Sequence, residues 1–192
     1  MFNEKKLPRL LCEEVFVKST LVFLFDKKSF IFIVVLSGVK RDKVGEIFIG
    51  EYRHTIDEKN RLIIPSSFRQ VLKKEEGNCI ITKGFDRSLF LYTFSEWQSL
   101  GSKLRNLSTS RSDVRAFLRI FFSGAHPVKP DNQGRITIPQ ALKDFACIKD
   151  KVVIIGAFNK IEIWSQDLWE NYYKEKKDIY EQIVEKIMDL GI

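Results

Sequence analysis

The sequence predicts an α+β fold built from two tandem copies of one small β module, each with flanking helices. Two observations carry this prediction. A nine-residue pattern at Asp57–Pro65 returns at Asp131–Pro139, 74 residues later. Around each copy, the same order of short strand, turn, strand, proline-led helix and strand pair can be followed. Repeats of this kind define the architecture, and two copies are too few for a solenoid.

Composition places the 192-residue chain among folded proteins of one or two small domains. It is 44% apolar and 30% charged, as is typical of globular proteins. Its 32 Lys and Arg exceed its 25 Asp and Glu, which gives a net charge of +7. The excess lies in residues 47–164, because residues 1–46 carry +3 and residues 165–192 carry −3. A basic region of this size favours a polyanionic partner.

The chain divides into three parts: an N-terminal extension at 1–46, a first module at 47–124 and a second module at 125–192. The extension contains two apolar runs, Val15–Phe25 and Phe30–Leu36. Neither run reaches the ~20 residues that span a bilayer, and no signal-peptide cleavage site follows them. We therefore expect an ill-ordered extension or a segment upstream of the true start, with a membrane anchor as the alternative.

Each module opens with a short strand, turns at Asp-x-x-x-Arg and continues into a second strand. A proline then starts a short helix, since its missing N–H would be unpaired at that position anyway. Two more strands follow, joined by a turn. In the first copy the expected strands are 52–56, Leu62–Ile64, Cys79–Thr82 and Ser88–Tyr92. In the second copy they are a strand near Val128, then Ile136–Ile138, Val152–Ile155 and Ile161–Trp164.

Longer helices are expected after each strand pair. Ser95 to Gln98 has the form of a capping box, which predicts a helix start at Ser95. Apolar residues from Val114 to Phe122 recur at helical spacing, and the stretch from Ser165 to Asp189 repeats this pattern. These stripes favour core packing or subunit contact over a ligand site.

Enzyme, metal and cofactor motifs are missing from the sequence. There is no GxGxxG, GxxxxGK[ST], HExxH or GxSxG, and the only histidines are His54 and His126. The cysteines, Cys12, Cys79 and Cys147, are far apart and form no CxxC pair. We therefore predict no enzymatic activity, no metal site and no cofactor.

The Asp-x-x-x-Arg turn is the most informative motif. Its fourth residue is Asn60 in one copy and Gly134 in the other, the two residue types that best tolerate positive φ. A left-handed residue before the arginine would direct Arg61 and Arg135 outward at the start of a strand. For Asp57 and Asp131 we favour a structural role, in which they bond turn amides or pair with the arginines.

Outward arginines on short rigid strands suit double-stranded DNA. Arginine grips phosphates and can read guanine bidentately in the major groove, which admits a β-ribbon. Arg61 is the stronger candidate because several cations crowd around it: Arg53, His54, Lys59 and Arg69. Arg135 has fewer cationic neighbours. Basic residues of the 103–119 helical region are expected on a solvated face or in subunit salt bridges.

The residues resemble the MraZ family, which is built from two AbrB/SpoVT-like swapped-hairpin modules. The resemblance covers about three quarters of the chain and is carried by these segments: Ile47–Tyr52, Asp57–Pro65, Arg115–Phe117, Phe121–Ala125, Asp131–Pro139 and Ile161–Trp164. It implies a cytoplasmic, nucleoid-associated regulator, usually a repressor, that binds direct repeats upstream of its own division and cell-wall gene cluster. It also implies homo-oligomeric rings, commonly octamers, without membrane attachment. By the family pattern Arg61 is the best-placed DNA contact, with Arg53 and Lys59 beside it and Arg135 in the matching place.

Two departures from the family pattern stand out. Asn60 replaces the usual glycine, and members usually begin with Met at the position of Ile47, so we expect translation to start near 44–47. The alternatives are an AbrB-like antitoxin or protein-interaction module, in which DNA binding is secondary, and a membrane-associated protein that uses residues 15–36. Two modules and an amphipathic C-terminal helix argue against the antitoxin.

Overall fold

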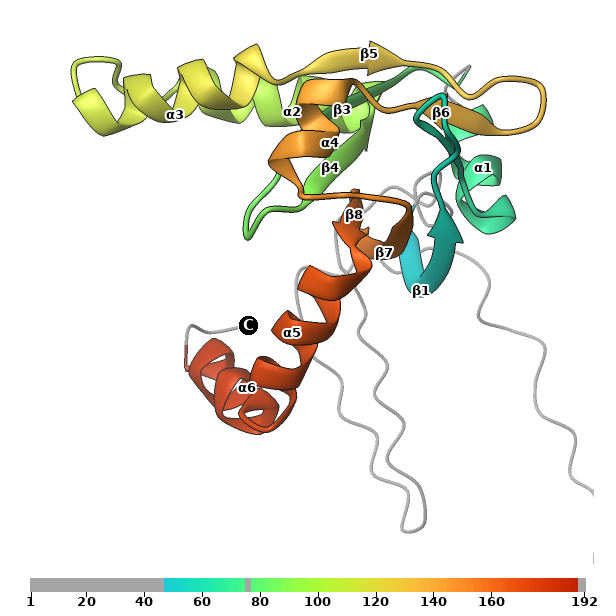
Figure 1. Cartoon of the computed structure of the whole chain (residues 1–192). Helices are drawn as coiled ribbons and strands as arrows, with labels where there is room; N and C mark the ends of the chain where they lie inside the picture. Colours follow the sequence, from blue (N-terminus) through green and yellow to red (C-terminus); the bar gives the residue numbers. More distant parts are fainter. Residues whose placement is uncertain (1–46, 75–76, 190–192) are drawn as a thin grey trace, which may run out of the picture. The chain divides into compact units, whose positions relative to one another are not determined.

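Helices and strands follow one another in the same order in the two halves of the chain. A computed structural model describes residues 47–74 and 77–189 (Figure 1). They belong to one compact unit, Gly45–Ile192. The expectations for 1–46, including the start site and the membrane alternative, lie outside the described residues.

The repeated order is strand, strand, helix, strand, strand, helix, helix. The first half contains β1 (Phe48–Thr55), β2 (Arg61–Ile63), α1 (Ser66–Lys73), β3 (Cys79–Lys83), β4 (Leu89–Thr93), α2 (Phe94–Arg105) and α3 (Ser112–Ser123). The second half contains β5 (His126–Val128), β6 (Arg135–Thr137), α4 (Gln140–Phe145), β7 (Lys151–Phe158), β8 (Ile161–Ser165), α5 (Gln166–Lys177) and α6 (Tyr180–Met188). The predicted mixture of helix and antiparallel sheet is confirmed.

Three local predictions differ from the structure. β1 begins at Phe48 instead of 52, because it pairs with β7 along its whole length. The predicted helix start at Ser95 is wrong: Thr93 is the N-cap of α2, and its side chain accepts a hydrogen bond from the Glu96 N–H at 3.2 Å. The stretch from 165 to 189 is two helices, since Asp178 and Ile179 separate α5 from α6.

One six-stranded sheet combines both halves. Its order is β1-β7-β8-β4-β3-β5, and every neighbouring pair is antiparallel. β1 pairs with β7 from Phe48 opposite Phe158 to Thr55 opposite Lys151. At the other edge β5 pairs with β3. The first strand of each half therefore lies beside the third strand of the other half.

The main core lies where the two halves interleave. Its fully buried side chains come from both copies of the repeat, including Leu62, Ile64, Phe68, Leu72, Ile81, Ile136, Ile138, Leu142 and Ile154. Burial of each such side chain contributes roughly 1.5–3 kcal/mol. Since the inner face of one half is covered by the other, neither half has a complete core of its own.

The helices after each strand pair pack through aromatic residues. Trp97 of α2 stacks on Phe121 of α3 at 5.6 Å between ring centroids, and Phe121 is buried in a second cluster with Phe90 and Tyr92. In the second half, Trp169 of α5 packs against Trp164 and donates from Nε1 to Glu51 Oε2 at 3.2 Å. α5 is thereby attached to β1.

Candidate nucleic-acid interface

The arginines of the two repeated turns lie on one face of a two-stranded ribbon. β2 and β6 pair antiparallel, with Ile63 opposite Arg135. Side chains alternate between faces along a strand, so Leu62 and Ile136 occupy one face and both arginines share the other. Leu62 and Ile136 are fully buried, whereas Ile63 is 45% exposed. The arginine face, with Arg61 at its start, is therefore the outward face.

The first turn is organised by the Asp57 carboxylate. Its Oδ1 accepts hydrogen bonds from the backbone N–H groups of Lys59 and Arg61, both at 2.9 Å. Its Oδ2 accepts from Arg61 Nε at 2.7 Å and lies 2.7 Å from Nη2 of the same guanidinium. Asn60 donates its N–H to the Asp57 carbonyl at 2.9 Å and has φ +58°. One carboxylate thus fixes both the turn and the arginine.

The second turn repeats this geometry. Asp131 Oδ1 accepts from the N–H groups of Gln133 and Arg135 at 2.9 Å. Asp131 Oδ2 accepts from Arg135 Nε at 2.8 Å and lies 2.7 Å from Nη2. Gly134 donates its N–H to the Asp131 carbonyl at 2.8 Å and has φ +78°. The repeated motif therefore produces one local structure twice.

These hydrogen bonds keep both carboxylates ionised. Bonds from the Arg61 side chain and backbone lower the pKa of Asp57 to about 2. Backbone and side-chain bonds from Arg135 lower the pKa of Asp131 from its ordinary value. A charged carboxylate beside each guanidinium holds that side chain in one orientation.

The other predicted cations of the first half lie in different surroundings. Lys59 is exposed at the tip of the first turn. Arg53, on β1, donates to Glu170 of α5 at 2.7 Å and lies 3.4 Å from Glu51, so its guanidinium is paired with carboxylates outside the turn. Partial burial lowers the pKa of His54, the other residue expected to add positive charge near Arg61, and so disfavours its charged form.

Contacts between each turn and the opposite half are not predicted from the motif. Gln140 and Lys143, both on α4, hydrogen-bond the Asn60 side chain of the first turn. Arg69, on α1, packs over Gly134 of the second turn. The repeat itself contains the signal that could have found them, because Arg69 and Lys143 are related by the same 74-residue offset as the turns.

Comparison with known families places the chain. The sequence model of the family described as "MraZ protein, putative antitoxin-like" matches residues 47–120 and again residues 121–189. The two matches cover more than half of the chain.

The chain belongs to the MraZ family.

Several relatives are named transcriptional regulator MraZ. Those of Clostridium tetani, Moorella thermoacetica and Natranaerobius thermophilus are 49%, 46% and 44% identical to this chain. Each identity extends over 146 residues, which are 100% of the relative and 76% of this chain. The resemblance to the MraZ family is therefore confirmed, and both copies of the MraZ pattern contain one of the turns described above.

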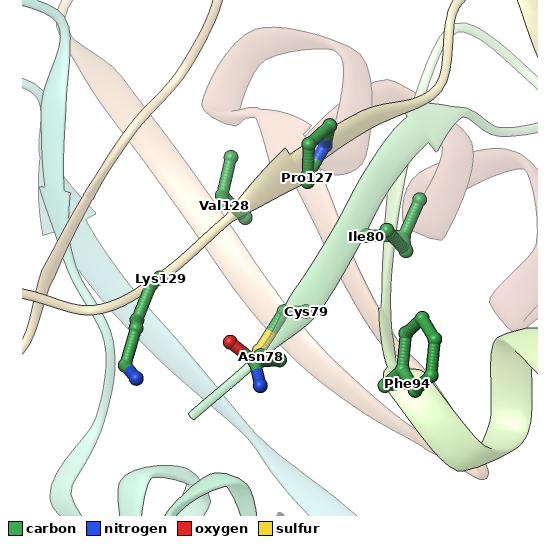
Figure 2. Close-up of a pocket in the computed structure, with 7 residues that line it drawn as sticks. All are labelled: Asn78, Cys79, Ile80, Phe94, Pro127, Val128 and Lys129. Carbon is green, nitrogen blue, oxygen red and sulfur yellow. The ribbon is translucent and has the colours of Figure 1, made fainter. Parts of the chain in front are cut away.

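Two surface grooves of the MraZ chain differ in the chemistry of their lining residues. A groove of about 320 Å³ between the two copies is lined mainly by apolar side chains, with Phe94 and Ile80 of the first copy on one side and Pro127 and Val128 of the second copy on the other (Figure 2). In the second copy a groove of about 240 Å³ has only polar and charged lining residues: Lys149, Asp150, Lys151, Ser165, Gln166 and Asp167. Neither set of lining residues includes a turn arginine.

Neither a membrane-spanning helix nor a metal-ligand cluster occurs in the described part of this MraZ chain. Across residues 47–74 and 77–189, no helix is both long and apolar enough to cross a bilayer. Within the same ranges, no three His, Cys, Asp or Glu side chains are grouped so that they could hold a metal ion. The candidate site is the β2–β6 ribbon with its two turns.

Proposed function

We propose that this protein is a transcriptional regulator that binds DNA sequence-specifically through the β2–β6 ribbon. The observation that carries the proposal is the presence of Arg61 and Arg135 on one outward face, each held by an aspartate. The names of the MraZ relatives support the regulatory role. In this proposal it represses the division and cell-wall gene cluster to which its own gene belongs, by binding repeats upstream of that gene.

The geometry of the guanidinium favours base reading. Asp57 occupies the Nε and Nη2 side of Arg61, which leaves the edge formed by Nη1 and Nη2 for a ligand. That edge matches O6 and N7 of guanine, and it also matches a phosphate. A two-stranded ribbon is narrow enough for the major groove, which is about 12 Å wide. Arg135 presents the same edge, because Asp131 holds it in the same way.

Lys59 and Arg53 contribute differently in this proposal. Lys59 is exposed at the turn tip, where a lysine ammonium reaches phosphate without reading sequence. Arg53 must first leave Glu170, but the two side chains are about half exposed and such pairs hold weakly. We therefore place Arg61, Arg135 and Lys59 at the DNA, with Arg53 joining as the duplex approaches.

Self-association is part of the proposal. Large apolar side chains stand exposed on the described surface, among them Ile49 at 64%, Phe158 at 59% and Ile120 at 58%. Such exposure supports contact between copies. A homo-oligomeric ring, for which we propose eight copies, would present several ribbons to several repeats, and linked sites gain avidity without new contacts. The protein would then act in the cytoplasm, on the nucleoid.

The test measures how tightly the full-length protein binds DNA upstream of its own gene and random DNA across a range of salt concentrations. We expect wild type to prefer the upstream repeats by about 10³-fold or more. Arg61→Ala should lose about 5- to 150-fold on the repeats, the value of one bidentate base contact. Arg119→Ala is the matched control, because Arg119 is an exposed arginine on α3.

Two outcomes would contradict the proposal. Equal affinity of wild type for upstream and random DNA would remove sequence specificity. Equal losses of affinity for the repeats in Arg61→Ala and Arg119→Ala would show that the ribbon does not contact the DNA bases. The first outcome would support the alternative function, an antitoxin-like protein-interaction module. The family description also contains the term "antitoxin-like".

A further inference from the structure

Each turn of the ribbon is held by a helix from the other half of the chain. The turn at 57–61 contacts α4, and the turn at 131–135 contacts α1. The backbone joins the halves at the same places. The Asn60 carbonyl accepts from the Ile138 N–H, and the Gly134 carbonyl accepts from the Ile64 N–H, both at 2.9 Å. The residue before each arginine is therefore fixed by the opposite half.

At the first turn the contact is a pair of side-chain hydrogen bonds. Asn60 Nδ2 donates to Gln140 Oε1 at 2.8 Å, and Lys143 Nζ donates to Asn60 Oδ1 at 2.9 Å. Both polar ends of the Asn60 side chain are thereby engaged, the Lys143 contact in a partly buried position. These bonds lock the orientation of the residue directly before Arg61.

At the second turn the contact is one of close packing. A Cβ on Gly134 would lie 2.3 Å from Cδ and 2.5 Å from Nη1 of Arg69. Arg69 Nη1 also donates to the Gln133 carbonyl at 3.4 Å. Arginine covers the turn here only because glycine leaves room for it. The halves thus use two matched pairs at one position, asparagine with lysine and glycine with arginine.

We propose that Lys143 and Gln140 are positioning residues for Arg61, and that Arg69 is the positioning residue for Arg135. This inference rests on the proposed function, since it names what aims the DNA-contacting arginines. Asp57 fixes Arg61 within its own turn, but it lies in that turn and moves with it. Lys143 and Gln140 belong to another element, so they fix the turn against the ribbon and the core. Each half of the chain thereby fixes the orientation of the turn arginine in the other half.

A positioning role predicts a different signature from a direct phosphate contact. A lysine that binds phosphate strengthens binding to every DNA and steepens the salt dependence by about 0.9 per contact on a log–log plot. A lysine that aims Arg61 strengthens binding only where Arg61 reads bases. The ratio of specific to random affinity therefore separates the two roles.

The experiment compares Asn60→Gly, Lys143→Met and the double variant with wild type, using the full-length protein on its upstream repeats and on random DNA. Asn60→Gly removes the side-chain contacts and keeps a residue that accepts positive φ. We expect each variant to lose about 3- to 10-fold on the repeats, which is the effect of one hydrogen bond. The affinity for random DNA and the slope of affinity against salt should stay as in wild type. The double variant should bind the repeats as tightly as the weaker of the two single variants.

Lys149→Met is the matched control, because Lys149 is an exposed lysine of the same half and its loss changes the net charge equally. A second design exchanges the pairs: Asn60→Gly with Lys143→Arg gives the first turn the residues of the second. This exchange should restore affinity for the repeats to within about twofold of wild type, since it recreates the packing at Gly134.

The outcomes separate this inference from the function on which it rests. If wild type binds its repeats specifically and neither Asn60→Gly nor Lys143→Met changes the ratio of affinities, the positioning role is wrong and the DNA-binding proposal stands. Equal losses on both DNAs with a shallower salt slope would make Lys143 a phosphate contact instead. If wild type shows no specificity, the function fails first, and the positioning inference fails with it.

Discussion

The two turns of the ribbon have the same skeleton and differ at the residue before the arginine. Three matching hydrogen bonds and one ion pair hold each arginine and its turn, and their lengths agree within 0.1 Å. The first turn has Asn60, which forms hydrogen bonds with α4, and the second has Gly134, which leaves space for Arg69. A local motif therefore sets the form of each turn, while the opposite half decides which residue it tolerates.

The largest expected effect concerns Gly134, the residue at which the second turn differs from the first. Gly134→Asn would give the second turn the residue of the first, but its Cβ would meet Arg69 at 2.3 Å. We expect a loss of about 2–3 kcal/mol in the free energy of unfolding, from overpacking against the Arg69 side chain. Chemical denaturation measures it. Adding Arg69→Lys should recover part of the loss, because lysine and asparagine already coexist at the first turn.

A control for that prediction lies on α2. Gly101→Asn makes the same chemical change where a Cβ would meet nothing within 4 Å, so it should be close to neutral. A loss at Gly101 as large as that at Gly134 would show that crowding by Arg69 is not the cause.

The comparison is sharpened by removing each arginine in turn. Because both guanidinium groups share one face and one type of aspartate contact, Arg135→Ala should weaken binding to the repeats about as much as Arg61→Ala. We expect about 2 kcal/mol for each, measured by titration with labelled DNA. A loss confined to Arg61→Ala would mean that a single half of the ribbon reads bases.

Acid provides a third way to compare the turns. The pKa of Asp57 is lowered in the folded state to about 2, so its contribution to stability is complete above its unfolded value of 3.8. That contribution is lost as the pH falls through the folded pKa. The difference in free energy of unfolding between wild type and Asp57→Asn should therefore shrink as the pH falls from about 4 to 2. Asp131→Asn should follow the same trend, because its pKa is lowered too.

A difference that stays constant between pH 5 and 2.5 would contradict the acid prediction. It would mean that the Asp57 carboxylate gains nothing from Arg61 in the folded state. Asp167→Asn is a control, since Asp167 is an acidic residue of α5 outside both turns.

The smallest expected effect concerns Arg53, which differs from the turn arginines in its partners. Glu170→Gln removes one negative charge and loosens the 2.7 Å contact with Arg53. We expect a rise of about twofold in affinity for any DNA, visible at low salt and lost at high salt, because exposed charges are screened. Glu175→Gln, on the same helix, should match it if charge alone matters. A larger rise in Glu170→Gln would indicate that the freed Arg53 contacts phosphate.

Local features of the fold could be predicted from the sequence because their causes are local. The Asp-x-x-x-Arg turn is set by bonds between residues no more than four positions apart, and the repeated order of elements follows from the repeated sequence. The helix start at Thr93 is also predictable, since Thr93 and Glu96 satisfy the same capping pattern two residues before Ser95.

Contacts between distant residues could not be predicted in this way. Arg53 meets Glu170 at a separation of 117 residues, and Asn60 meets Lys143 at a separation of 83. The Arg53–Glu170 pairing has no periodic or motif signal, and the Asn60–Lys143 pairing has only an indirect one, since Arg69 and Lys143 share the 74-residue offset of the turns. The sequence also does not specify which strands pair with β1 and β5 in the sheet. Strands of this composition can pair with any strand that covers their apolar face.

The exchange of first strands between the halves also has a consequence for synthesis. A ribosome releases β1 about 100 residues before its partner β7, which takes roughly 5–20 s at ordinary rates of translation. Throughout that interval β1 is an unpaired edge, and the free side of β3 is one from its own synthesis until β5 follows about 45 residues later. Such edges join other chains readily. When several ribosomes translate one messenger RNA, neighbouring nascent chains can therefore exchange strands. The rate at which the second half is synthesised therefore affects how many chains pair β1 with their own β7.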